Sequence, residues 1–142
     1  MTDAAPSIQR SFRLSASTVE LLDAAAASGG ESRNALADRL LAEALRTEHH
    51  PLIRFRTGAA GRREPVIVGT RLLVRQVVAQ LKDADAGAQQ VADALDRPLR
   101  DVRAAMSYYA DFPMEVDADA RWAADIEAAE RARWEREQAA FA

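Results

Sequence analysis

Residues 8–45 read IQRSFRLSASTVELLDAAAASGGESRNALADRLLAEAL, and the pattern in this stretch decides the predicted fold. Apolar and polar residues alternate at its start, so Ile8, Phe12 and Leu14 share one face of a predicted strand. No other segment among the first 50 residues alternates, and a lone strand leaves its backbone hydrogen bonds unmade. The sequence therefore predicts that a second copy of the chain pairs with this strand in a homodimer. The opposite face of the strand carries Gln9, Ser11, Arg13 and Ser15.

Two helices should follow the strand. Ser17 and Glu20 have the spacing of a capping box, which predicts a helix start. The glycine pair at 29–30 is expected to end that helix. Ser32 can cap a second helix, which should end before His49. Its apolar stripe consists of Leu36, Leu40, Leu41 and Leu45.

This order of elements has a known parallel. The stretch FRLSASTVELLDAAAASGGESRNALADRLLAEAL, residues 12–45, resembles the ribbon-helix-helix repressors. The resemblance implies a dimer whose paired strands enter the major groove of operator DNA, with the second helix docked by its N-terminus on a phosphate. Arginine and glutamine suit base-edge contacts, although an ordinary solvated strand face and simple helix capping remain alternatives. The expected DNA-binding residues are Gln9, Ser11, Arg13, Ser15, Ser32, Arg33 and Asn34.

The central part of the chain predicts short strands near 52–56 and 65–68 and helices over 74–82, 89–95 and 98–110. Three short helices in series are typical of a helix-turn-helix unit. PVIVGTRLLV, residues 65–74, resembles the Gly-Thr-Arg-hydrophobic-x-Val motif of a small bacterial family of unknown function with a helix-turn-helix-like fold. HPLIRFRTGAAGRREP and AAMSYYADFPMEVDADA extend the resemblance over residues 50–120.

Two departures from that family's pattern concern the loops. Gly61-Arg62-Arg63-Glu64 replaces a tighter turn, and Leu73 stands where proline is usual. Within the motif we expect a structural role for Gly69, Thr70 and Arg71, with the Arg71 guanidinium holding carbonyls or a carboxylate such as Asp101.

Members of this family are commonly antitoxins of the VapB type, encoded beside PIN-like ribonuclease toxins. The resemblance therefore implies a ribonuclease toxin as partner, and the tail is the segment expected to bind it. Residues 115–142 hold 4 basic and 8 acidic side chains, and a helix should start at Asp117, with Asp117 and Asp119 as its acidic N-terminal cap. Its arginines could reach the carboxylate-lined metal site of such a nuclease. The expected partner-binding residues are Trp122, Ile126, Arg131, Arg133, Trp134, Arg136 and Phe141.

Composition narrows the function further. The chain has 142 residues, a net charge of −3 and no cysteine, which excludes disulfides and thiolate metal sites and favours a cytoplasmic location. No segment is apolar enough for a membrane span. No catalytic motif is visible, so we expect no enzyme and no cofactor. His49 and His50 would point apart at a helix end, so we expect no metal site.

The arginines of the central part have two interpretations. They could form a phosphate-binding patch, or some could lie on a recognition helix of the central unit; charged runs are more often plain solvated surface. The recognition-helix candidates are Arg97, Arg100 and Arg103.

These observations predict a mainly α protein with short β elements. We expect a ribbon-helix-helix dimerisation domain over 1–48, a helix-turn-helix-like domain over 49–114 and a C-terminal toxin-binding helix over 115–142. The predicted function is that of an antitoxin that neutralises a PIN-like ribonuclease and represses its own operon. The alternatives are a stand-alone dimeric transcriptional repressor and a structural adaptor without a DNA role.

Overall fold

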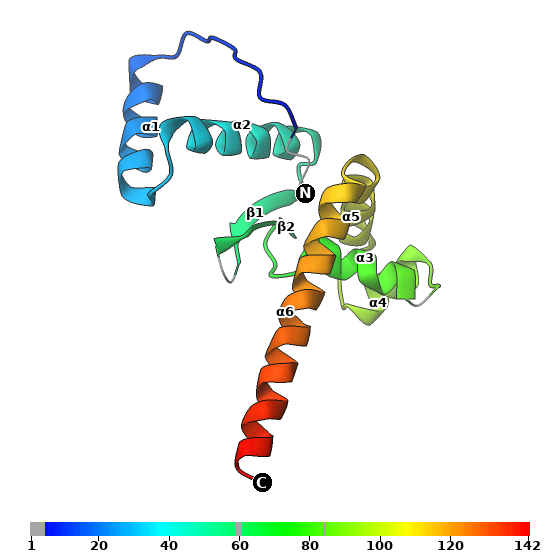
Figure 1. Ribbon diagram of the computed structural model, residues 1–142. Helices are drawn as coiled ribbons and strands as arrows, with labels where there is room; N and C mark the ends of the chain where they lie inside the picture. Colours follow the sequence, from blue (N-terminus) through cyan, green and yellow to red (C-terminus); the bar gives the residue numbers. More distant parts are fainter. Residues whose placement is uncertain (1–4, 59–60, 84) are drawn as a thin grey trace. The chain divides into compact units, whose positions relative to one another are not determined.

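The computed structural model describes residues 5–58, 61–83 and 85–142 (Figure 1). The chain divides into two compact units, Met1–Ala42 and Glu43–Ala142. Helix α2 (Arg33–His49) begins in the first unit and ends in the second. The proposed functional boundaries at 48 and 114 remain predictions. Within the described ranges, no helix is long and apolar enough to cross a membrane.

The first unit contains helix α1 (Ala16–Gly29) and the start of α2. Ser15 caps α1 by accepting a hydrogen bond from the Thr18 backbone N–H, so the cap lies two residues before the predicted Ser17. Gly30 ends α1 with a φ of 74°, a left-handed conformation that glycine adopts without a Cβ penalty. Ser32 caps α2 as predicted, since its Oγ accepts from the Ala35 N–H at 3.1 Å.

The predicted ribbon-helix-helix fold is wrong for this chain. Such a fold places its strand at the N-terminus, whereas residues 5–15 have no regular secondary structure and lead directly into α1. Alternation at Ile8, Phe12 and Leu14 fits a strand, but a strand also needs a neighbour to complete its hydrogen bonds. Among the described residues, the paired strands lie in the second unit and bond to each other.

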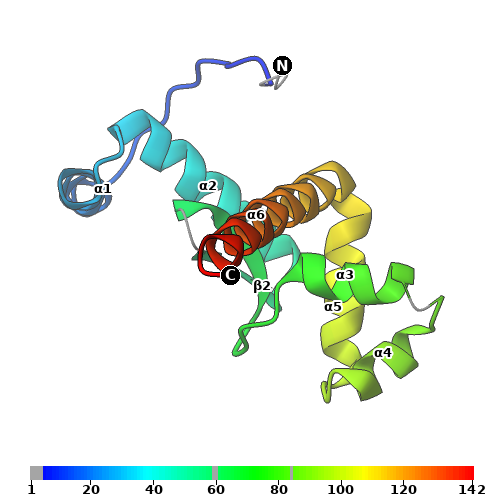
Figure 2. The ribbon, with the colours of Figure 1, turned by 60° about the horizontal axis from the view of Figure 1, so that its bottom comes forward.

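The second unit is built on a hairpin. Strand β1 (Ile53–Thr57) pairs antiparallel with β2 (Arg63–Ile67), with Ile53 opposite Ile67. The turn-rich stretch predicted between them includes residues 59–60, which lie outside the described ranges. The hairpin is followed by α3 (Val74–Asp83), α4 (Ala88–Ala94), α5 (Leu99–Asp111) and α6 (Pro113–Ala140). Figure 2 shows α3 and α4 beside α5, and their apolar faces form one core with the hairpin.

The core of this unit consists of small and β-branched side chains around one buried ring, Tyr108. The hairpin contributes Ile53 and Ile67, and the first turns of α6 contribute Val116. The helix predictions over 74–82, 89–95 and 98–110 are confirmed within one residue at every end. The C-terminal helix starts at Pro113, earlier than the predicted Asp117, because proline suits the first turn of a helix.

Candidate functional site

The first turns of α6 are anchored to the rest of the second unit. Val116, Asp119 and Ala123 are buried, and Arg62 donates two hydrogen bonds to Asp119 Oδ1, at 2.7 Å and 3.0 Å. The Arg62 guanidinium also lies over the Trp122 ring, 5.2 Å from its centroid. Burial raises the pKa of Asp119, and the Arg62 charge opposes that shift. Arg62 therefore compensates a carboxylate that is largely removed from water.

The distal part of α6 has no such anchor. Every residue from Ala124 onward is exposed, including Ile126, and Trp134 and Phe141 expose 60% and 92% of their surfaces. In Figure 1 this part of the helix extends beyond the other elements of its unit. Trp122, by contrast, is only partly exposed. The predicted partner-binding residues thus divide into Trp122, which packs within the unit, and an exposed distal set: Ile126, Arg131, Arg133, Trp134, Arg136 and Phe141.

The helical repeat assigns the distal side chains to faces. At roughly 100° per residue, Trp134 and Phe141 lie within about 20° of each other. Arg131 lies about 60° from Trp134, whereas Arg136 lies about 160° away, on the other side of the helix. Arg133 pairs with Glu137 at 3.0 Å. A partner that covers the aromatic face would therefore meet Arg131 first among the three arginines.

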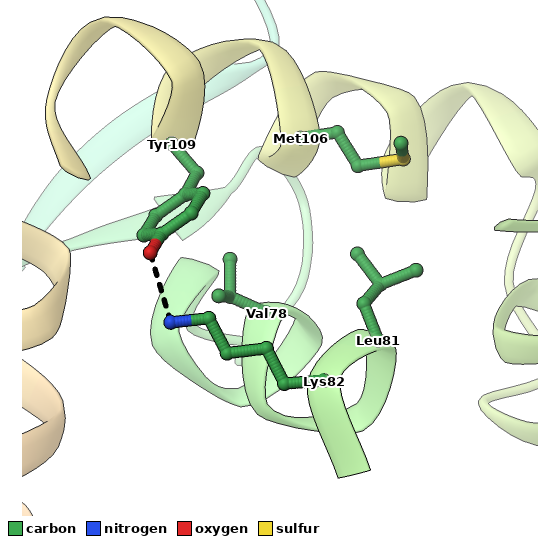
Figure 3. A pocket seen from close by; sticks show the side chains of 5 residues that line it. All are labelled: Val78, Leu81, Lys82, Met106 and Tyr109. Carbon is green, nitrogen blue, oxygen red and sulfur yellow. Dashed lines mark hydrogen bonds between the residues drawn. The ribbon is translucent and has the colours of Figure 1, made fainter. Parts of the chain in front are cut away.

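A small pocket lies between α3 and α5, with a volume of about 240 Å³ (Figure 3). Val78, Leu81 and Met106 give it an apolar lining, and the polar ends of Lys82 and Tyr109 meet at its side. Lys82 Nζ donates to Tyr109 Oη at 2.8 Å and to Asp117 Oδ1 at 3.1 Å, and Tyr109 Oη donates to Asp117 Oδ1 at 3.0 Å.

These hydrogen bonds raise the pKa of Lys82 and lower that of Asp117. The polar groups of the pocket thus satisfy one another and fasten α6 to α3 and α5. We assign the pocket no ligand.

The predicted DNA-binding residues are all exposed, and some of them have local roles in the first unit. Ser15 and Ser32 are helix caps, and Arg33 forms an ion pair with Asp23 at 2.9 Å. The others are exposed, and three of them precede the first helix: Gln9, Ser11, Arg13 and Asn34.

The Gly69-Thr70-Arg71 motif forms the turn after β2. Gly69 has a φ of 72°, and Thr70 Oγ1 donates to the Ile67 carbonyl at 2.9 Å and accepts from the Leu72 N–H at 3.0 Å. Arg71 is exposed. The carboxylate suggested for it, Asp101, accepts instead from Arg97 at 2.7 Å and 3.1 Å. Glycine and threonine therefore shape this turn, and the proposed ion pair of Arg71 with Asp101 is wrong.

Sequence reasoning missed a cluster at the ends of α2 and α5. His50 is buried, and its Nε2 lies 2.8 Å from Asp111 Oδ2, while His49 Nε2 lies 3.6 Å from the same oxygen. The expectation that the two rings point apart is wrong, because the chain turns after α2 and brings both toward α5. The adjacent histidines were the available signal, but Asp111 lies too far along the sequence to be matched with them.

Comparisons with protein-family models, with curated proteins and with solved structures find no match to this chain.

Proposed function

We propose that this chain is the antitoxin of a toxin–antitoxin pair and that the distal part of α6 binds a PIN-like ribonuclease. The observation that carries the proposal is the exposed aromatic pair at the end of α6, where the other side chains after Ile126 are charged, small or, at Gln138, an amide. Trp134 and Phe141 lie on one face, beyond the part of α6 that is anchored by Arg62. A solvated tryptophan of this kind is a typical interface anchor.

The charges beside the aromatic face are mixed, since Glu130 lies about 40° from Trp134 and Arg131 about 60°. Arg131 is the arginine nearest to that face, and its guanidinium could bind a carboxylate of the nuclease's metal site. A helix laid into a groove would bury the aromatic side chains while its opposite side, which carries Asp125 and Arg136, stays in water. Residues 50–120 resemble a family of unknown function whose members are commonly VapB-type antitoxins, and this resemblance favours the same partner.

The test is ribonuclease inhibition, using the nuclease encoded beside this gene. Full-length protein should inhibit it, and a chain lacking residues 127–142 should not, because the truncation removes exposed helix only. Trp134→Ala should weaken the complex by about 2 kcal/mol or more. Met114→Ala, which alters another exposed apolar residue of the same unit, should bind normally. Equal inhibition by the full-length and truncated proteins would place neutralisation elsewhere in the chain.

A second pair of variants tests the helix face. Arg131→Ala should reduce inhibition by more than Arg136→Ala, since the latter side chain projects from the opposite side of α6. Equal effects would mean that the partner does not approach along the Trp134 face. Circular dichroism of the two variants should be unchanged, because both arginines are fully solvated.

The proposal includes a homodimer, repression of the operon through operator DNA, and action in the cytoplasm. What supports a second copy is the exposure of Ile8, Phe12 and Leu14. Operator binding is supported by the solvated side chains of Gln9 and Arg13 alone. If Arg13→Ala binds operator and random DNA as the unmodified protein does, this residue has no part in DNA recognition.

A further inference from the structure

Three potential metal ligands meet where α2 and α5 end. His49 is the last residue of α2, His50 follows it, and Asp111 is the last residue of α5. The candidate ligand atoms of these three side chains all lie within 4.8 Å of one another. All three residues belong to the second unit, so their arrangement does not depend on how the two units are placed.

The two distances to the Asp111 carboxylate are close to those around one shared ion. Zinc lies about 2.0–2.2 Å from imidazole nitrogen and carboxylate oxygen, so neighbouring ligands of a tetrahedral ion are roughly 3.3 Å apart. The two histidine Nε2 atoms lie 2.8 Å and 3.6 Å from Asp111 Oδ2, on either side of that value. The His49 side chain is 78% exposed, so its ring can adjust without disturbing the core.

One ligand is already held in position. The His50 side chain is 4% exposed, and its ring meets Tyr108 edge-on with 5.2 Å between centroids and Phe112 with 6.0 Å. Such support orients a ligand before an ion arrives. The neighbouring Arg46 does not oppose a cation strongly, because it forms an ion pair with Glu115.

We propose that His49, His50 and Asp111 bind a divalent first-row transition ion, with zinc the expected occupant. Two imidazoles and one carboxylate suit zinc, cobalt or nickel, whereas magnesium and calcium require mainly oxygen ligands. Both His49 and Asp111 reach solvent, so water completes the coordination. The ion would join His50 and Asp111, which are 61 residues apart in sequence, and stabilise the folded second unit.

The experiment titrates full-length protein with zinc chloride in a calorimeter and records thermal unfolding with and without zinc. We expect one ion per chain, a Kd of about 10 µM or tighter, and a rise in Tm of several degrees. His49→Gln removes an exposed ligand and should weaken binding at least about 10-fold while leaving the metal-free Tm unchanged. Glu48→Gln, an exposed neighbour outside the cluster, is the matched control and should bind zinc normally.

Three results would overturn the proposal. The first is no binding of zinc by the unmodified chain, which would make the His50–Asp111 contact a structural hydrogen bond only. The second is equal zinc affinity in His49→Gln and the unmodified chain. The third is binding of magnesium chloride as tight as that of zinc chloride. None of these results involves α6 beyond Ala124, so they are independent of the proposed nuclease binding.

Discussion

Because Tyr108 is buried, the stability of the second unit should decrease at alkaline pH. Its side chain is 1% exposed, and burial raises its pKa to about 12, against the opposing charge of Arg46. An unfolded tyrosine ionises near pH 10, so above that pH the unfolded chain loses its proton before the folded chain does. Stability should therefore be unaffected below pH 10 and fall by about 1–3 kcal/mol between pH 10 and pH 12.

Urea unfolding followed by tryptophan fluorescence at about pH 8 and about pH 11 measures this loss. Tyr108→Phe keeps the ring and removes the ionisable group, so its stability should fall less over the same interval. Some decline should persist, because the raised pKa of Lys82 adds stability that is also lost as pH rises. An identical decline in Tyr108→Phe and the unmodified chain would show that Tyr108 is not the group responsible.

The ion pair of Arg62 with Asp119 should contribute more to folding stability than the exposed ion pair of Arg133 with Glu137 does. The Asp119 side chain is 11% exposed and that of Arg62 is 34%, so Arg62→Ala leaves a carboxylate without its partner in a partly dry site. We expect a loss of about 1–3 kcal/mol in urea unfolding. Arg133→Ala, which breaks the solvated pair with Glu137, is the matched control and should cost less than about 0.5 kcal/mol.

A double variant of Arg62 and Asp119 tests whether the loss of stability in Arg62→Ala comes from the unpaired carboxylate charge. Asp119→Asn should restore part of the stability lost in Arg62→Ala, because a neutral amide no longer needs the guanidinium. If Arg62→Ala and Arg133→Ala cost the same, burial of Asp119 has no energetic weight and this ion pair does not help to hold α6 in place.

Among the elements, the turn after β2 depends on one backbone conformation. Gly69 has a φ of 72°, and a Cβ built there meets no atom within 4 Å, so any cost of a side chain arises from the backbone. Gly69→Ala should lower stability by about 1–2 kcal/mol. Gly69→Asn should lose less, because asparagine tolerates the left-handed region. Equal losses in thermal unfolding of the two variants would contradict this explanation.

The helices of the second unit could be predicted from sequence because each has a local cause. Apolar spacing marks α3 and α5, and prolines at 98 and 113 adjoin the starts of α5 and α6. The strand predicted over residues 8–14 had a local pattern without a partner, and alternation alone does not supply backbone hydrogen bonds. Local signals therefore predicted the helices correctly. The prediction of the N-terminal strand was wrong because a strand also requires a second strand to pair with.

The candidate sites of the whole molecule also differ in whether a local sequence pattern predicts them. The exposed end of α6 could be predicted, because its aromatic residues lie in a stretch too polar to build a core. The contacts of Arg62 with Asp119 and of His50 with Asp111 could not, since they join residues 57 and 61 positions apart. Such pairings follow from the tertiary fold, in which the hairpin, α5 and α6 share one core.

The exposed N-terminal segment makes a prediction for the whole molecule in solution. Ile8 and Phe12 expose 73% and 72% of their surfaces and Leu14 exposes 54%. Full burial of such side chains is worth about 1.5–3 kcal/mol each, which favours a second copy of the chain as their cover.

Sedimentation at micromolar concentration should therefore find a dimer for the unmodified chain and a monomer for Phe12→Asp, since a carboxylate there would be costly to bury. Ser11→Asp adds the same charge at the neighbouring polar position and should remain dimeric. A monomeric unmodified chain would remove the homodimer from the proposed function. A dimeric Phe12→Asp would instead move the contact to another surface, and the exposed Leu40 and Leu41 of α2 would be the next residues to change.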